Sequence, residues 1–158
     1  MSEHDELSSL DQVREQVRHS SVAIAAALDY LDLDEPASAT CWLVPQADDI
    51  VVYVLTGAVL HRFGGTRDDP PTTSGERRDS ACDARAIPLR GATFELSVTA
   101  KAVGESKQPG ATERGWTFHL PGEPPLTCTS AGSGPSARDE TAFATALAKE
   151  ITDTMAHP

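Results

Sequence analysis

The chain has 158 residues, of which 24 are acidic and 13 are lysine or arginine, so that its formal net charge is −11. This length suits one domain with one hydrophobic core. The acidic balance argues against binding of nucleic acid or of anionic lipid through bulk charge. The longest apolar run, residues 20–28, is too short to span a bilayer. We therefore expect a soluble protein without a nucleic-acid partner and without an integral membrane segment.

Residues 8–32 are predicted to form an amphipathic helix, which lies in an acidic N-terminal segment, residues 1–36. Apolar residues recur there at steps of three and four, the spacing of one helix face. The members of this stripe are Leu10, Val13, Val17, Ile24, Leu28 and Leu31. Such a stripe needs a cover, which the rest of the chain, a second copy or another protein can supply.

Between residues 39 and 129 the apolar residues alternate with polar ones, which predicts strands. Seven strands are expected, at residues 39–44, 50–56, 58–63, 82–89, 93–103, 115–120 and 125–129. The polar stretch 64–81 is expected to be a mobile loop, and residues 104–115 to be a hairpin tip. A second apolar stripe then predicts a C-terminal amphipathic helix; it consists of Phe143, Ala146, Leu147, Ile151 and Met155.

The second and third predicted strands meet at Gly57, which supplies the positive φ of a tight hairpin turn. With a two-residue loop, one face of this hairpin carries Val52, Val54, Val59, His61 and Phe63, and the other carries Val51, Tyr53, Leu55, Leu60 and Arg62. Both faces are mainly apolar. One face is expected in the core, and the other is a candidate surface for a partner.

Three cysteines, Cys41, Cys82 and Cys128, are spread along the chain without a C-x-x-C pair. Each lies in a strand-like run, where a free cysteine behaves as a small buried hydrophobe. A metal site would require these three and His61 to converge from distant positions. We expect reduced thiols, no metal or cofactor, and a cytoplasmic location.

Three stretches carry a resemblance to a known family: "VVYVLTGAVLHRF", "ARAIPLRGATFEL", and "GWTFHLPGEPPLTCTS" followed by "ETAFATALAKEI". In their order they resemble the bacterial pleckstrin-homology-like and GRAM-related domains, over residues 38–156. The resemblance implies an α+β, mainly β fold for residues 37–158, a partly open barrel of seven antiparallel strands in two orthogonal sheets, closed by the C-terminal helix. The N-terminal helix is an addition to that pattern.

Phosphoinositide binding, the best-known activity of that family, is not expected, because the loop "PQADD" (45–49) carries two acids and no base. No nucleophile elbow, phosphate loop or zinc-protease motif is present in the sequence. An arrangement of His119 with Cys82 or Cys128 and Asp83 is the enzymatic alternative. The interpretation favoured for His119 is a solvent-facing residue, and the protein is not expected to be an enzyme.

The leading hypothesis is therefore a non-enzymatic interaction module, which offers a sheet edge or a groove beside the C-terminal helix to a peptide or protein. Candidate partner-binding residues are Leu10, Val13, Val17, Tyr53, His61 and Arg62. The first three could also join two copies of the chain. The alternative is a small acidic chaperone-like dimer for a protein client. This alternative requires a helix within residues 64–81, which Pro70, Pro71 and Gly75 make unfavourable.

Overall fold

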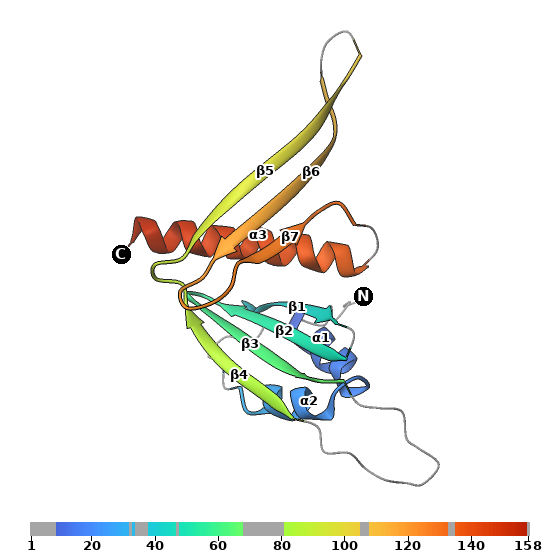
Figure 1. Cartoon of the computed structure of the whole chain (residues 1–158), viewed down its shortest axis with the longest axis vertical. Helices are drawn as coiled ribbons and strands as arrows, with labels where there is room; N and C mark the ends of the chain where they lie inside the picture. Colours follow the sequence, from blue (N-terminus) through green and yellow to red (C-terminus); the bar gives the residue numbers. More distant parts are fainter. Residues whose placement is uncertain are drawn as a thin grey trace, which may run out of the picture. The chain divides into compact units, whose positions relative to one another are not determined.

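The computed structural model describes residues 9–31, 33, 38–46, 48–67, 81–104, 108–132 and 135–157 (Figure 1). The chain divides into two units, Met1–Ile87 and Pro88–Pro158, which we call the first and the second unit. The division falls at Pro88, so the N-terminal helices share a unit with the first sheet and do not form a segment of their own.

In its described residues the first unit contains two helices and a sheet of four strands in the order β1-β2-β3-β4. The helices are α1 (Ser9–Arg18) and α2 (Val22–Asp29). The strands are β1 (Thr40–Pro45), β2 (Asp49–Thr56), β3 (Val59–Thr66) and β4 (Cys82–Pro88). Each of these strands matches a predicted strand within three residues at either end. The strand β3 is longer than predicted because Gly64–Thr66 continue it. Residues 68–80 of the predicted mobile loop lie outside the described residues.

The single helix predicted over residues 8–32 is wrong in one respect, because the chain leaves the helical conformation at Ser21. The backbone of Ser21 is extended (φ −157, ψ 107), and its buried side chain accepts a hydrogen bond from the Ile24 N–H, which starts α2. A serine cap satisfies a helix N–H that has no partner within the helix. The break lets Val17 of α1 and Ile24 of α2 both point into the core.

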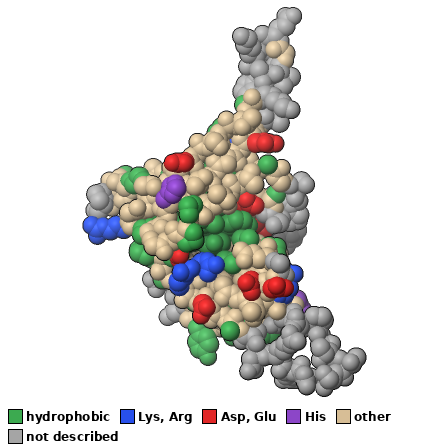
Figure 2. All heavy atoms as spheres, in the orientation of Figure 1, with side chains coloured by type: hydrophobic (Ala, Val, Ile, Leu, Met, Phe, Trp, Pro, Cys, Tyr) green, Lys and Arg blue, Asp and Glu red, His purple; other side chains and the backbone are tan. Residues whose placement is uncertain are grey.

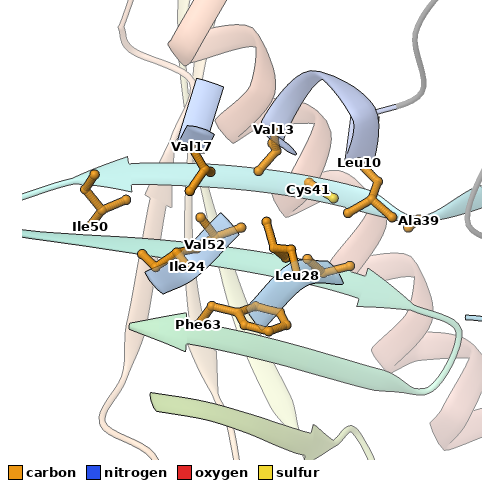
Figure 3. Close-up of a cluster of buried hydrophobic side chains, with 11 residues drawn as sticks. Leu10, Val13, Val17, Ile24, Leu28, Ala39, Cys41, Ile50, Val52 and Phe63 are labelled. Carbon is orange, nitrogen blue, oxygen red and sulfur yellow. The ribbon is translucent and has the colours of Figure 1, made fainter. Parts of the chain in front are cut away.

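Both helices cover one face of the first sheet (Figure 3). The core there consists of Leu10, Val13, Val17, Ile24, Leu28, Ala39, Cys41, Ile50, Val52, Val54 and Phe63. The start of α1 is tied to β1, since the Ser9 hydroxyl accepts the Cys41 N–H at 2.9 Å. The predicted apolar stripe of the N-terminal helix is thus covered by strands of its own unit.

The hairpin of β2 and β3 has the predicted turn and faces. Thr56 pairs with Val59 across Gly57, whose φ is +54. On the helix-covered face Val52 and Val54 belong to the core. On the opposite face Tyr53 lies between Trp42 and Arg62 of the neighbouring strands, and its ring stacks on Trp42 with 5.7 Å between centroids.

The second unit contains a sheet in the order β5-β6-β7 and one long helix. Its elements are β5 (Thr93–Val103), β6 (Gln108–His119), β7 (Leu126–Thr129) and α3 (Pro135–Ala156). The expected hairpin tip 104–115 is too long, because β6 already begins at Gln108 and residues 108–109 and 112–115 pair with β5; Thr112 lies opposite Ala100, for example. Over its described residues the chain therefore has the predicted α+β composition, with antiparallel sheets of four and three strands and a C-terminal helix.

The helix α3 packs on β5 and β7 and carries most of its predicted apolar stripe inward. Phe143, Leu147 and Ile151 are fully buried, as is Ala144, whereas Met155 is 54% exposed. No helix in the described part of the chain is long and apolar enough to cross a membrane.

Candidate functional site: a groove between β5 and α3

The strands of the second sheet place alternate side chains on the face that α3 covers. The register sets Phe94, Leu96 and Val98 of β5 beside Phe118, Trp116 and Arg114 of β6, respectively. Because side chains on one face of a strand recur every second residue, these six form two adjacent rows on that face. Trp116 and Phe118 are buried, and the Phe94 ring lies 5.9 Å from the Phe118 ring.

The cover that α3 provides is incomplete along β5. Leu96 is 50% exposed and Val98 is 57% exposed, although both point to the helix-covered face. Between β5 and α3 lies a hollow of about 330 Å³. It is lined by Phe94, Leu96, Arg114, Trp116, Thr145, Ala148, Lys149, Thr152 and Asp153. Its lining combines aromatic and aliphatic side chains with three charged ones, Arg114, Lys149 and Asp153.

Arg114 is held over an aromatic side chain of this lining. Its guanidinium carbon lies 5.2 Å from the centroid of the Trp116 ring, which is within cation–π range. Its backbone is fixed by Ser130, whose hydroxyl accepts the Arg114 N–H at 2.8 Å and whose N–H donates to the Arg114 carbonyl at 2.9 Å. The guanidinium is therefore positioned by both its ring contact and its backbone.

A second hollow, of about 540 Å³, also has Arg114 in its wall. It is lined by Thr112, Arg114, Ser130, Gly132, Ala137, Arg138, Thr141 and Ala142. Together the two hollows follow one side of α3 from Ala137 to Asp153. We call these two hollows, which share Arg114 in their walls, the α3 groove; one part is mainly apolar and the other carries Arg114 and Arg138.

The charges along the groove are unevenly compensated. Lys149 at the apolar part is 3.5 Å from Asp153 and forms an ion pair with it. Among the described residues, no carboxylate lies within ion-pair distance of Arg114 or Arg138. Glu140, close to Arg138 in sequence, accepts the Thr129 N–H at 2.6 Å. The net positive charge of the groove is thus at its Arg114 end.

The outer edge of β5 has no strand partner within the described residues. The short β7 pairs only with Gly115–Phe118, so the distal parts of β5 and β6 form a two-stranded ribbon that extends beyond β7 (Figure 1). An open edge presents unpaired backbone N–H and C=O groups to any extended chain. Here that edge borders the apolar part of the groove.

The opposite face of the second sheet is polar. It carries Thr93, Glu95, Ser97, Thr99, Thr117, His119 and Thr127. The surface over β5 and β6 in Figure 2 is accordingly largely tan with red and little green. His119 Nε2 is 3.9 Å from Glu95 Oε1, with both side chains well exposed. This arrangement agrees with the interpretation of His119 as a solvent-facing residue.

The structure does not assemble the enzymatic alternative within the second unit. Cys128 lies opposite Trp116 on the helix-covered face, whereas His119 points to the other face. Burial raises the pKa of the Cys128 thiol to about 12, with Glu140 adding to the shift, so the thiol is protonated at neutral pH. Cys82 and Asp83 lie on β4 of the first unit, where burial and then Asp83 raise the pKa of Cys82.

The predicted partner-binding residues are all in the first unit. Leu10, Val13 and Val17 are 1%, 5% and 0% exposed within its core and offer no open surface. Tyr53 and Arg62 are half-buried beside each other on the opposite face of the sheet. His61 is half-buried, and burial lowers its pKa.

No group of three or more metal-ligating side chains comes together among the residues that the structure describes, and all three cysteines are free. No protein-family model, curated protein or solved structure matches this chain. The site is therefore assigned from its own geometry.

The sequence suggests a sheet edge or a groove beside the C-terminal helix as a candidate surface, but it does not indicate the residues that line the α3 groove. Arg114 was placed in a hairpin tip, because residues 108–114 lack the alternation of a half-buried strand. Only the long pairing with β5 brings Arg114 to the groove.

Proposed function

We propose that this protein is a non-enzymatic interaction module of the pleckstrin-homology-like class, and that it binds an extended peptide segment along β5 and the α3 groove. The family assignment is supported by the order of elements, seven antiparallel strands before one long helix. The partly open barrel that the resemblance implies is part of this proposal.

The observation that carries the proposal is the exposure of Leu96 and Val98 on a strand with an open edge. An exposed apolar edge strand invites pairing with another chain unless a partner covers it. A peptide that adds a strand to β5 forms backbone hydrogen bonds along the edge and directs alternate side chains into the hollow. The hollow at Phe94 and Trp116 can accept an apolar side chain of that peptide.

The same proposal includes no phosphoinositide, nucleic acid or cofactor. The stretch from the end of β1 to the start of β2, residues 45–49, contains Asp48 and Asp49 and no base, so phosphate groups would be repelled there. A cytoplasmic location is supported by the three free thiols, which persist in a reducing compartment. The chaperone-like alternative depends on residues 64–81, of which Gly64–Thr66 are strand and 68–80 lie outside the described residues.

The test is a selection of phage-displayed dodecapeptides on the full chain, followed by calorimetry with the selected peptides. We expect Leu96→Asp to weaken binding about tenfold or more, because a charge replaces apolar surface that the peptide buries. Ser97→Asp is the matched control, since the adjacent side chain points to the polar face. Equal affinities for both variants would contradict the proposal.

Light scattering over a range of concentrations examines whether a second copy occupies the edge instead. We expect that the wild-type chain forms no oligomer that the Leu96→Asp substitution would dissociate. A dimer that disappears in Leu96→Asp and persists in Ser97→Asp would assign this edge to self-association and would contradict the peptide proposal.

A further inference from the structure

We infer that the peptide recognised by the α3 groove is acidic: it places a carboxylate at Arg114 and Arg138 and apolar side chains at Leu96 and Phe94. This inference rests on the proposed function and specifies the chemistry of the partner. It follows from the distribution of charge in the groove and from the register of β5 and β6.

The groove contains uncompensated positive charge in an otherwise acidic chain. The chain has 24 acidic residues and 13 lysines and arginines. Within the described residues, the guanidinium groups of Arg114 and Arg138 nevertheless have no carboxylate at ion-pair distance, while Lys149 is paired with Asp153. A partner with one acid therefore gains attraction at the Arg114 end and none at the Lys149 end.

Arg114 is suited to hold a carboxylate because little of its freedom has to be lost on binding. Its contact with Trp116 and the two backbone hydrogen bonds with Ser130 already position it. Guanidinium groups bind carboxylates through two parallel N–H donors, and a positioned guanidinium gives up less entropy in doing so. The apolar ring beneath it also reduces competition from water on one side.

The register gives the spacing of the peptide residues. A residue that pairs with Val98 from outside lies two strand spacings from Arg114, about 10 Å between backbones, which extended glutamate and arginine side chains can bridge. Residues two and four positions away on the same face lie opposite Leu96 and Phe94. For a peptide antiparallel to β5, the order is acidic, any, apolar, any, apolar.

The reverse direction gives the reverse order, apolar, any, apolar, any, acidic. We assign the antiparallel direction, because the second sheet is antiparallel throughout its described pairs and antiparallel ladders are slightly more stable per residue. The order of acidic and apolar residues in the bound peptides therefore shows whether a peptide runs antiparallel or parallel to β5.

The inference is tested with the phage-selected peptides, each synthesised also with its aspartate or glutamate replaced by the corresponding amide. We expect selected peptides to carry an acid two positions before the first apolar residue. On the wild-type chain the amide version should bind about tenfold more weakly. On Arg114→Gln this difference should shrink to about twofold or less, as expected when the two groups interact directly.

The matched control is Arg90→Gln, which removes the same charge from an exposed turn of the second unit outside the groove. It should keep the full tenfold difference. Arg138→Gln, on the exposed side of α3, provides a second variant if Arg114→Gln disturbs the packing on Trp116. Circular dichroism of each variant identifies any loss of folding.

The outcomes separate the two proposals. Peptides that lose binding with Leu96→Asp but carry no acid, or bind equally as amides, would overturn this inference and leave the proposed function intact. A difference that persists equally in Arg114→Gln and Arg138→Gln would also overturn it. The absence of any peptide sensitive to Leu96→Asp would overturn both.

Discussion

A methyl group added at Gly65 is expected to separate α2 from the strands beneath it. A Cβ at this position would lie 2.9 Å from the Ala81 carbonyl oxygen and 2.9 Å from Cγ1 of Ile24. Neither neighbour can move freely, because Ile24 is fully buried and the Ala81 carbonyl accepts the Thr66 N–H. Overpacking of this kind costs about 1–3 kcal/mol, and the replacement of glycine in a strand returns about 0.5 kcal/mol. Gly65→Ala should lower the free energy of unfolding by about 1–2 kcal/mol.

Gly64 provides a control on the same strand. A Cβ there would lie 2.8 Å from Nη1 of Arg62, the far end of a flexible side chain that can rotate away. Gly64→Ala should therefore stay within about 0.5 kcal/mol of the wild type. The two variants add the same methyl group to opposite faces of β3, so their difference isolates the contact with α2.

The measurement is urea unfolding followed by tryptophan fluorescence. The chain has two tryptophans, Trp42 in the first unit and Trp116 in the second, so that a Trp116→Phe background reports the first unit alone. With a urea dependence of about 1.5 kcal/mol per molar, the midpoint should fall by about 1 M in Gly65→Ala. A midpoint equal to or above that of Gly64→Ala would refute the argument that Gly65 is required by the close approach of α2.

Four further predictions concern the first unit. Ser21→Ala should lower its free energy of unfolding by about 1 kcal/mol in the same assay, because the cap of α2 is lost, and Ser20→Ala should have a smaller effect. Iodoacetamide at pH about 8 should modify Cys82 well before Cys41, whose pKa burial raises to about 12, as mass spectrometry would show; similar rates would contradict this. Because burial raises the pKa of Cys41 from 9.0 to about 12, the stability that this thiol contributes is complete below pH 9.0 and is lost as the pH rises toward about 12. The urea midpoint of Cys41→Ala should therefore decline less between these two pH values than the midpoint of the wild type. Burial lowers the pKa of His61, so the stability that it contributes is present above 6.5 and is lost as the pH falls below that value; His61→Gln should flatten this part of the acid dependence.

The strands could be predicted because their side chains obey local rules. Phe94 to Lys101 alternate without interruption, and Gly57 sits where only a tight turn with positive φ fits, so β5 and the hairpin of β2 and β3 follow directly from the sequence. The break at Ser21 could not be predicted in the same way. The apolar spacing from Val17 to Ile24 is seven residues, which continues a helical period whether or not the helix is interrupted.

The first part of β6 could not be predicted because its pairing is with β5 and not with a core. Residues 108–114 show no alternation, and nothing local distinguishes them from a loop. The exposure of Leu96 and Val98 could not be predicted from the sequence either, since it depends on how far α3 reaches across the sheet. A strand pattern shows which side chains share a face, but the cover over that face is a property of the packed chain.

Two apolar surfaces of the structure differ in whether the chain itself covers them. The apolar stripe of α1 and α2 is covered by β1, β2 and β3 of its own unit, so its amphipathic pattern requires no second molecule. On β5, by contrast, Leu96 and Val98 point to the side of α3 and are still half exposed, beside Arg114, which has no carboxylate at ion-pair distance among the described residues. An apolar face that is already covered carries no information about binding. An open apolar strand edge beside uncompensated positive charge, by contrast, indicates a partner that is both apolar and acidic. We therefore expect recognition at the second unit and not at the N-terminal helix.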